Sequence, residues 1–394
     1  PSPSPGGRPF GIVRRVDLEA YRAAGLYDPT SPTAQDRADL LSYLESEGCT
    51  LEEMKAAEAR GRLFALAGDR RILPEAESWT LADLAARLGR SVDEVAVVWR
   101  AYGLVVPEDP EVPVAGPADL AAVGTFFVSA AAMGMEPALG LARVFGAATA
   151  RVGDATSAAV RSGNGDLNVA ITGSEARTAK AYGEATRLVD GMSAVLDVLL
   201  RHHLQAARRH FEQSDSVDVV GERGVRMGVG FADLSGFTRT SAQLELDDLS
   251  RLLSGLEDIT LDVVGRGGGR VVKYIGDAVM FVAPRLEQLL DIALALSEHP
   301  AAASVGMPVR VGISFGTLLA QEGDYFGAPV NLASRLVALA EPGTVLADAV
   351  LAARADPTAF TADPDYPAEV RGWDEPVLVA RLRRAASVGP NLVR

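Results

Sequence analysis

The sequence predicts an α+β protein with an all-helical N-terminal part and a C-terminal part in which strands and helices alternate. The N-terminal part, residues 17–173, carries helix-capping residues and apolar residues at helical spacing. After Gly221 the pattern changes, and short runs of strand-forming residues alternate with helical segments. At 394 residues the chain is long enough for two or three domains with cores of their own.

Composition excludes some classes of partner and favours one compartment. The 38 basic and 52 acidic residues give a net charge of −14, which argues against nonspecific binding to nucleic acid or anionic membranes. The one cysteine, Cys49, cannot form an intrachain disulfide, as is typical of a reducing cytosol. No signal-peptide pattern is present, and the longest apolar stretch, 121–135, is shorter than a membrane span. We therefore expect a soluble cytoplasmic protein with no nucleic-acid partner.

Composition and capping residues divide the N-terminal part. Residues 1–16 are rich in Pro, Gly and Ser and are expected to form a flexible arm. Thr33 precedes a predicted helix over 34–47, and Thr50 opens the next helix with an acidic first turn. These signals continue to Gly173 and predict an all-helical domain.

Residues 81–104 resemble a helix-turn-helix. Thr80 and Asp83 form a start similar to a capping box, and Gly89 separates two short helices. A DNA-binding role is disfavoured, because the second helix begins with acidic residues and few basic residues are available for phosphates. We prefer two packed helices of a regulatory bundle.

A helical linker over 174–216 connects the two parts, with a long helical stretch predicted from Ser174 to about Gln213. Four of its apolar residues share one stripe of that helix by their spacing, namely Leu188, Met192, Val195 and Leu199. The stripe is either a core face or a short dimer seam.

The C-terminal part, residues 217–385, shows the order βα–ββ–αβ of a ferredoxin-like palm. The predicted strands are 226–233, 269–274, 278–283 and 309–320, and the predicted helices are 241–264, 286–298 and 328–340. Residues 345–347 and 377–382 supply later strands, and 386–394 form a tail.

Two carboxylates stand at the ends of predicted strands. Asp233 ends the first strand, and Asp277 lies in the turn between the second and third strands. If these strands are neighbours, both acids emerge at one edge of the sheet and can hold two divalent cations. A single Asp at a strand end is ordinarily a turn former, so the prediction depends on both motifs together. The turn after Asp233 also offers backbone N–H groups to phosphate oxygens.

Three strings carry a family resemblance: FADLSGFT at 231–238, KYIGD at 273–277 and DYFGAPVNLASR at 324–335. In this order they resemble the catalytic domain of class III nucleotidyl cyclases. The resemblance implies conversion of ATP to cyclic AMP and pyrophosphate, by in-line attack of the ribose 3′ oxygen on the α-phosphorus. It does not identify a general base.

The resemblance assigns metal and base-selecting roles. Asp233 and Asp277, with the carbonyl of Leu234, are the implied ligands of two Mg²⁺ or Mn²⁺ ions per site, and oxygen ligands suit both metals. Lys273 and Asp324 are the implied base-selecting pair. Adenine presents an acceptor at N1 beside a donor at N6, so a lysine and an aspartate match it, whereas guanine reverses this pattern.

The resemblance also assigns transition-state and phosphate-binding roles. Asn331 and Arg335, four residues apart on one helix face, are implied to orient the ribose and to stabilise charge on the reacting phosphate. Arg371 is implied to meet the leaving phosphates. The implied phosphate loop consists of Leu234, Ser235, Gly236, Phe237 and Thr238. In the family the metal ligands and the Asn–Arg helix come from opposite subunits, so a head-to-tail homodimer with two sites is implied.

The N-terminal part resembles the regulatory half of actinobacterial cyclases, including pH-regulated ones, which implies that it biases the catalytic domains between competent and autoinhibited pairings. His202, His203 and His210 fall in the linker, and we hypothesise acid activation through His202 or His203. Surface histidines without a role are the alternative. The Gly- and Ala-rich segment 121–150 either encloses a lipid or fatty acid or is ordinary core.

Two rival functions remain. A diguanylate cyclase would use the same palm but needs an acidic Gly-Gly-Glu-Glu-Phe-like turn, whereas the turn here is Tyr-Ile-Gly-Asp at 274–277. A nucleotide-sensing pseudoenzyme or transcription regulator is disfavoured, because the motif residues for metal binding and charge stabilisation are all present.

Overall fold

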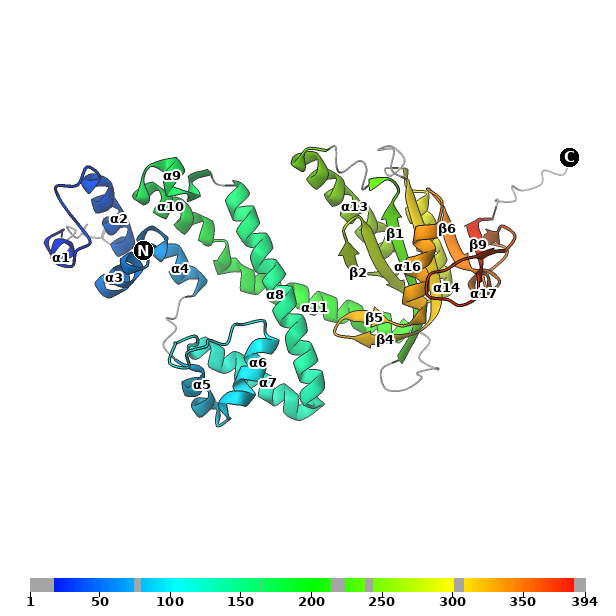
Figure 1. Ribbon diagram of the computed structural model, residues 1–394, viewed down its shortest axis with the longest axis horizontal. Helices are drawn as coiled ribbons and strands as arrows, with labels where there is room; N and C mark the ends of the chain where they lie inside the picture. The colour runs from blue at the N-terminus through cyan, green and yellow to red at the C-terminus, as the bar shows by residue number, and fades with distance from the viewer. Residues whose placement is uncertain are drawn as a thin grey trace, which may run out of the picture. The chain divides into compact units, whose positions relative to one another are not determined.

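The computed structural model describes residues 18–73, 79–163, 165–213, 224–237, 244–300 and 308–385. The chain forms two compact units, one up to Leu199 and one from Leu200 onwards (Figure 1). The predicted arm 1–16 and tail 386–394 lie outside the described residues.

The first unit is helical in its described part, apart from an isolated bridge between Trp79 and Ala115. Its helices are α1 Leu18–Ala23, α2 Ala34–Ser46, α3 Leu51–Ala59, α4 Leu66–Ile72, α5 Leu81–Leu88, α6 Val92–Ala101, α7 Pro117–Met133, α8 Met135–Gly163, α9 Val169–Thr172, α10 Glu175–Thr186 and the first part of α11 Val189–Gln213.

Two apolar cores hold the first unit together. One includes Leu40 and Met54 and lies between α2, α3, α4 and α10. The other includes Trp99 and Phe126 and lies between α5, α6, α7 and α8. The apolar stretch 121–135 therefore packs partly into a core, and among the described helices none is long and apolar enough to cross a membrane.

Helix starts in this unit test the capping predictions. Thr50 and Thr80 both form capping boxes, which confirms these two helix starts. The helix predicted after Thr33 is also present as α2 with Thr33 at its N-cap position, but the Thr33 side chain makes no capping hydrogen bond. Asp36 in the first turn of α2 instead accepts a hydrogen bond of 2.8 Å from the N–H of Glu175. An acid of one helix thus caps another helix, α10, which local sequence does not reveal.

The helical stretch predicted over 174–213 is helical in the structure, but it consists of two helices. The chain breaks at Arg187 and Leu188, between α10 and α11. At the break the hydrogen bonds span three residues, from Arg187 N–H to the Glu184 carbonyl and from Asp190 N–H to the Arg187 carbonyl, both 3.1 Å. Leu188 therefore leaves the predicted stripe, whose later members Val195 and Leu199 are exposed on α11.

The second unit contains a nine-stranded sheet in its described part. The strands are β1 Gly224–Leu234, β2 Arg270–Ile275, β3 Ala278–Ala283, β4 Val309–Gln321, β5 Asp324–Phe326, β6 Val345–Asp348, β7 Phe360–Ala362, β8 Tyr366–Ala368 and β9 Val377–Arg384. The helices are α13 Leu246–Arg266, α14 Leu286–Ser297, α16 Ala328–Leu339 and α17 Ala349–Ala352.

The strand order is β2-β3-β1-β4-β6-β9-β7, with β5 paired to β4 and β8 paired to β9. The first four strands with α13 and α14 form the predicted βα–ββ–αβ palm, which confirms the α+β fold class. The short elements β5, β7, β8 and α17 were not predicted, because three or four residues give too little periodicity to recognise.

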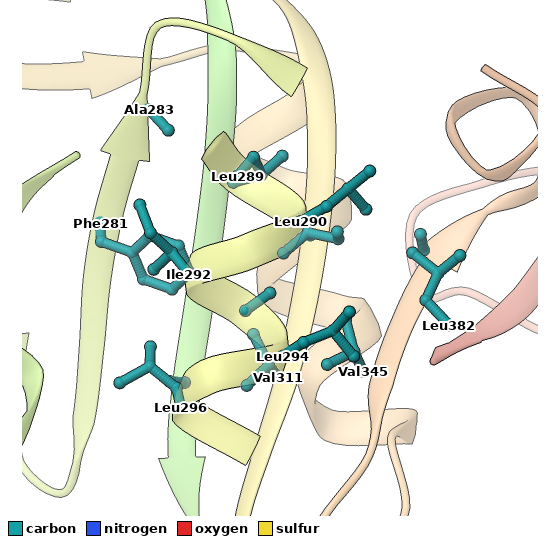
Figure 2. Close-up of a cluster of buried hydrophobic side chains, with 14 of the residues drawn as sticks. Phe281, Ala283, Leu289, Leu290, Ile292, Leu294, Leu296, Val311, Val345 and Leu382 are labelled. Atoms are coloured by element: carbon teal, nitrogen blue, oxygen red, sulfur yellow. The ribbon is translucent and has the colours of Figure 1, made fainter. Parts of the chain in front are cut away.

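Both faces of the sheet are covered. On β1, Val229 and Phe231 join a cluster that includes residues of α16. Gly228 faces α14 instead, and a Cβ there would lie 2.6 Å from Leu289, so the close approach of α14 requires glycine. On that face, Figure 2 shows the leucines of α14 packed over Phe281 and the neighbouring strands. The rigid two-sided packing fixes the strand ends that carry the candidate site.

Candidate active site

The two acids predicted to share one sheet edge do so. β1 and β3 pair antiparallel with Asp233 opposite Ala278, so Asp277 is the next residue along the chain from Asp233's partner. Ile275 pairs with Ala278, which leaves a two-residue turn at Gly276 and Asp277. Gly276 has φ 63°, a left-handed conformation that glycine adopts readily in such hairpins. This turn delivers the Asp277 carboxyl beside that of Asp233.

The two carboxyl groups interact strongly. Partial burial, and next the negative charge of Asp233, raise the pKa of Asp277 above its ordinary value. Two ionised carboxylates in one half-buried place repel each other unless a cation lies between or beside them. The edge is therefore electrostatically suited to bind positive charge.

Arg310 is a site residue that the sequence analysis missed. It lies directly opposite Asp233 in the β1–β4 pairing, and its Nε donates to Asp233 Oδ2 at 2.8 Å. The guanidinium also donates through Nη2 to the same oxygen. The signal in the sequence was weak, since a basic residue near the start of a predicted strand acquires meaning only once the strand register is known.

The donor set at this edge fits a hard divalent cation. It consists of the carboxylates of Asp233 and Asp277, and Leu234, whose carbonyl the resemblance implies as a further ligand, ends β1. The described residues contain no cluster of three or more His, Cys, Asp or Glu side chains that would form an all-protein metal cage. Mg²⁺ commonly binds one or two carboxylates and takes its other ligands from water and substrate phosphates.

Some residues of the predicted phosphate loop make contacts within the protein that do not serve phosphate binding. The N–H of Ser235 donates to the carbonyl of Pro308 at 3.1 Å, so it is not aimed at a ligand as expected for this loop. Phe237 packs against the core beside α14. Gly236 has φ 85°, which favours glycine in this turn. Thr238 lies outside the described residues.

The base-selecting pair is also brought together. The Nζ of Lys273 contacts Oδ2 of Asp324, and both side chains are about one-third exposed, at 37% and 26%. A bulge in β2 between Val271 and Lys273 shifts the register against β3 and re-aims the lysine. Asp324 begins β5, a strand absent from the sequence prediction.

Asn331 and Arg335 lie on the exposed face of α16. Gly312 of β4 lets this helix approach closely, since a Cβ there would lie 2.2 Å from the backbone N of Val337. The buried side of α16 thereby turns Asn331 and Arg335 outwards, as their four-residue spacing predicts. In the described part of the chain, Arg335 has no ion-pair partner. Arg371 is exposed in the turn after β8.

The linker histidines differ in environment. His202 and His203 are exposed on α11. His210 is largely buried, and its Nε2 has no hydrogen-bond partner among the described residues. Burial, and next the charge of Arg270, lower the pKa of His210 to about 4. His210 therefore remains neutral between about pH 5.5 and 8, and this argues against it as an acid switch in that range.

A pocket in the first unit is lined by residues outside the segment 121–150, for which a lipid and ordinary core packing were the two alternatives. Its volume is about 210 Å³, and its lining from α8, α10 and α11 includes Val160, Tyr182 and Met192. Within 121–150, the buried Phe126 and Leu139 belong to the second apolar core. These two residues favour core packing over a cavity in that segment.

Comparison with known proteins decides the family. Residues 20–210 match the family described as adenylate cyclase regulatory domain, and residues 219–379 match the adenylate and guanylate cyclase catalytic domain. An uncharacterized protein of Mycobacterium tuberculosis is 42% identical over 375 residues, which cover 93% of this chain and 94% of that protein. The chain belongs to the class III nucleotidyl cyclases.

Other relatives of this cyclase have named activities. An adenylate cyclase of Glutamicibacter nicotianae is 30% identical over 350 residues, 85% of each chain. The pH-sensitive adenylate cyclase MT1302 of Mycobacterium tuberculosis is 30% identical over 377 residues, 89% of each chain. The likeness spans both units, so the helical unit is an adenylate cyclase regulatory domain and the palm is a cyclase catalytic domain.

Proposed function

We propose that this cyclase converts ATP to 3′,5′-cyclic AMP and pyrophosphate. Family membership leaves adenine and guanine open, because the catalytic family contains cyclases for both bases. The observation that favours adenine is the contact between Lys273 and Asp324, which supplies one donor and one acceptor side by side. Adenine offers the complementary acceptor N1 and donor N6.

The acid edge supports the chemistry proposed for the triphosphate. Asp233 and Asp277 would hold two Mg²⁺ or Mn²⁺ ions, which lower the pKa of the ribose 3′ hydroxyl and neutralise phosphate charge when bound. Arg310 adds a fixed positive charge beside Asp233 at the same edge. Arg371 is the proposed contact of the leaving phosphates. The residues thus favour in-line attack of the 3′ oxygen on the α-phosphorus.

We propose that the active enzyme is a head-to-tail homodimer with two sites. The support is that Asn331 and Arg335 are exposed on α16 and so are accessible to a second molecule. In the proposed dimer Asn331 orients the ribose, and Arg335 stabilises charge on the reacting phosphate of the site whose acids belong to the other subunit.

The activity is tested with purified protein, Mn²⁺ or Mg²⁺, and either ATP or GTP. We expect cyclic AMP, with kcat/KM for ATP at least about 10-fold above that for GTP, because wrong pairing leaves charged groups without partners. A preference for GTP would contradict the assignment of the base-selecting pair. Absence of any cyclic nucleotide would contradict cyclase activity.

Site sharing is tested by mixing inactive variants. Asp233→Ala and Arg335→Ala should each be inactive alone, but a mixed dimer contains one site with intact acids and an intact arginine. The matched control mixes Asp233→Ala with Asp277→Ala, which damages the acids of both sites and should not recover activity. If confirmed mixed dimers of the first pair stay inactive, the sites are not shared between subunits.

We further propose that the helical unit regulates the catalytic domains in response to acid through His202 or His203. The support is the likeness to a relative named as pH-sensitive and the exposure of both imidazoles on α11. Activity is measured between about pH 5.5 and 8 for wild type, His202→Ala and His203→Ala. We expect greater activity at acid pH in wild type and a flatter profile in at least one variant; three identical profiles would exclude the mechanism.

A further inference from the structure

Two residues to which the family resemblance gives no role, Arg270 and Tyr325, adjoin the base-selecting pair. Arg270 begins β2, three residues before Lys273, and Tyr325 follows Asp324 on β5. Nη2 of Arg270 donates a hydrogen bond of 3.0 Å to the hydroxyl of Tyr325. The guanidinium carbon lies 5.5 Å from the centre of the tyrosine ring. One arginine therefore holds Tyr325 both by its hydroxyl and by its ring.

Tyr325 in turn fixes the orientation of Asp324. The backbone N–H of Tyr325 donates to Oδ1 of Asp324 at 2.8 Å, while Oδ2 contacts Lys273. Each carboxylate oxygen thus has its own donor. The plane of the carboxylate is set by the position of the Tyr325 backbone as well as by the lysine.

The backbone alone holds this position weakly. β5 has three residues and, among the described strands, pairs with β4 alone. The hairpin before it contains Glu322 at φ 52° and Gly323 at φ 78°, both in the left-handed region. A three-residue strand at the end of a hairpin gains little stability from its own ladder. The side chain of Tyr325 is only 9% exposed, and its contacts add the stability that the three-residue strand β5 does not gain from its backbone hydrogen bonds.

We propose that Arg270 and Tyr325 are positioning residues that hold the Asp324 carboxylate in place for the adenine amino group. The proposal rests on the proposed function, because it assumes that Lys273 and Asp324 select the base. Arg270 and Tyr325 act through Asp324 and make no contact with substrate. Their loss should therefore weaken base recognition more than the chemical step.

The test measures kcat and KM for ATP and GTP with purified full-length Tyr325→Phe and Arg270→Gln. Tyr325→Phe removes the hydroxyl of the hydrogen bond with Arg270, and Arg270→Gln removes the positive charge and shortens the side chain. We therefore expect kcat/KM for ATP to fall about 3- to 10-fold in each variant, chiefly through KM. The ATP-to-GTP preference should narrow by a similar factor. Arg270→Lys keeps a donor for the tyrosine hydroxyl and should restore part of the preference.

Tyr274→Phe is the matched control. Its hydroxyl also makes a hydrogen bond from β2, at 2.9 Å to Thr260, but toward α13. We expect this variant to keep the wild-type ATP-to-GTP preference even where its thermal stability falls.

The outcomes separate this proposal from the proposed function. A wild-type enzyme without ATP preference contradicts the base-selecting pair itself. A wild-type preference that survives in folded Tyr325→Phe and Arg270→Gln, or losses in kcat that are equal for both nucleotides, overturns the positioning role. Thermal unfolding identifies a variant that does not fold. If Tyr325→Phe does not fold, the ATP-to-GTP preferences of Arg270→Gln and Arg270→Lys are compared instead, and the positioning role requires a weaker preference in Arg270→Gln.

Discussion

The acid edge, formed by Asp233, Asp277 and Arg310, and the base-selecting pair, formed by Lys273 and Asp324, are two ionic clusters that differ in net charge. At the acid edge two carboxylates share one guanidinium, and the pKa of Asp277 is raised by burial and by its neighbour. In the base-selecting pair one ammonium meets one carboxylate. Surplus negative charge suits a metal, whereas a balanced donor and acceptor suit a neutral base. Net charge thus distinguishes the two binding roles that we propose for one sheet.

Removing one acid should produce the largest effect. We expect Asp277→Asn to lower cyclase activity by at least about 10²–10³-fold, because the proposed metal site loses a charged ligand. The same change should stabilise the metal-free protein at pH 7 by up to about 1 kcal/mol, since it removes an ionised group that the fold disfavours.

Activity assays and thermal unfolding in chelator measure these two effects of Asp277→Asn. Asp365→Asn, an exposed aspartate before β8, is the control and should change neither quantity. Retained activity in Asp277→Asn would break the comparison, because the acid edge would then not be needed for metal binding.

A change in the base-selecting pair should be smaller and should depend on the base. Asp324→Asn replaces a pure acceptor by a group that also donates, so we expect kcat/KM for ATP to fall about 10- to 100-fold. GTP should be affected less, and the ATP-to-GTP ratio should approach unity. Steady-state kinetics with both nucleotides provide the measurement. Equal losses for ATP and GTP would show that Asp324 supports the fold or the chemistry and not the choice of base.

The smallest effect concerns His210, near the arginine that supports the base-selecting pair. Its pKa of about 4 lies below the ordinary 6.5, so the unfolded chain takes up a proton first as the pH falls. Stability is therefore lost from about pH 6.5 downwards to about pH 4. Between pH 7 and 5 the free energy of unfolding should fall by about 1–2 kcal/mol more in wild type than in His210→Gln.

Denaturant unfolding of the catalytic unit at the two pH values measures this difference. His202→Gln, an exposed histidine on the same helix, should keep the wild-type acid sensitivity. If His210→Gln loses as much stability at acid pH as wild type does, then burial and the charge of Arg270 do not lower the pKa of this imidazole in the folded protein.

Much of the catalytic unit was predictable from sequence because its signals are local. The turn Ile275–Ala278 needs a glycine at positive φ, and the flanking strands are recognisable by their apolar residues. The position of Asp277 in that turn followed directly. Its proximity to Asp233 followed from one further assumption, that β1 and β3 are neighbours, and the sheet has this pairing.

Other features could not be predicted, because they depend on register and on distant contacts. Arg310 reaches Asp233 only because β4 pairs with β1 in one particular register. The β2 bulge before Lys273 and the short strand β5 have no clear sequence pattern. The helix break at Arg187 has no proline or glycine to mark it.

The sequence by itself determined the order of the longer strands and helices of the catalytic unit, the capped helix starts at Thr50 and Thr80, and the motif acids at the strand ends. These depend on interactions within a few residues, which any reader of the chain can evaluate. The tertiary structure decided which charges meet: Arg310 with Asp233, Lys273 with Asp324, and Arg270 with Tyr325. Strand register and helix docking set these pairs, and they result from packing the whole sheet between its two helical layers.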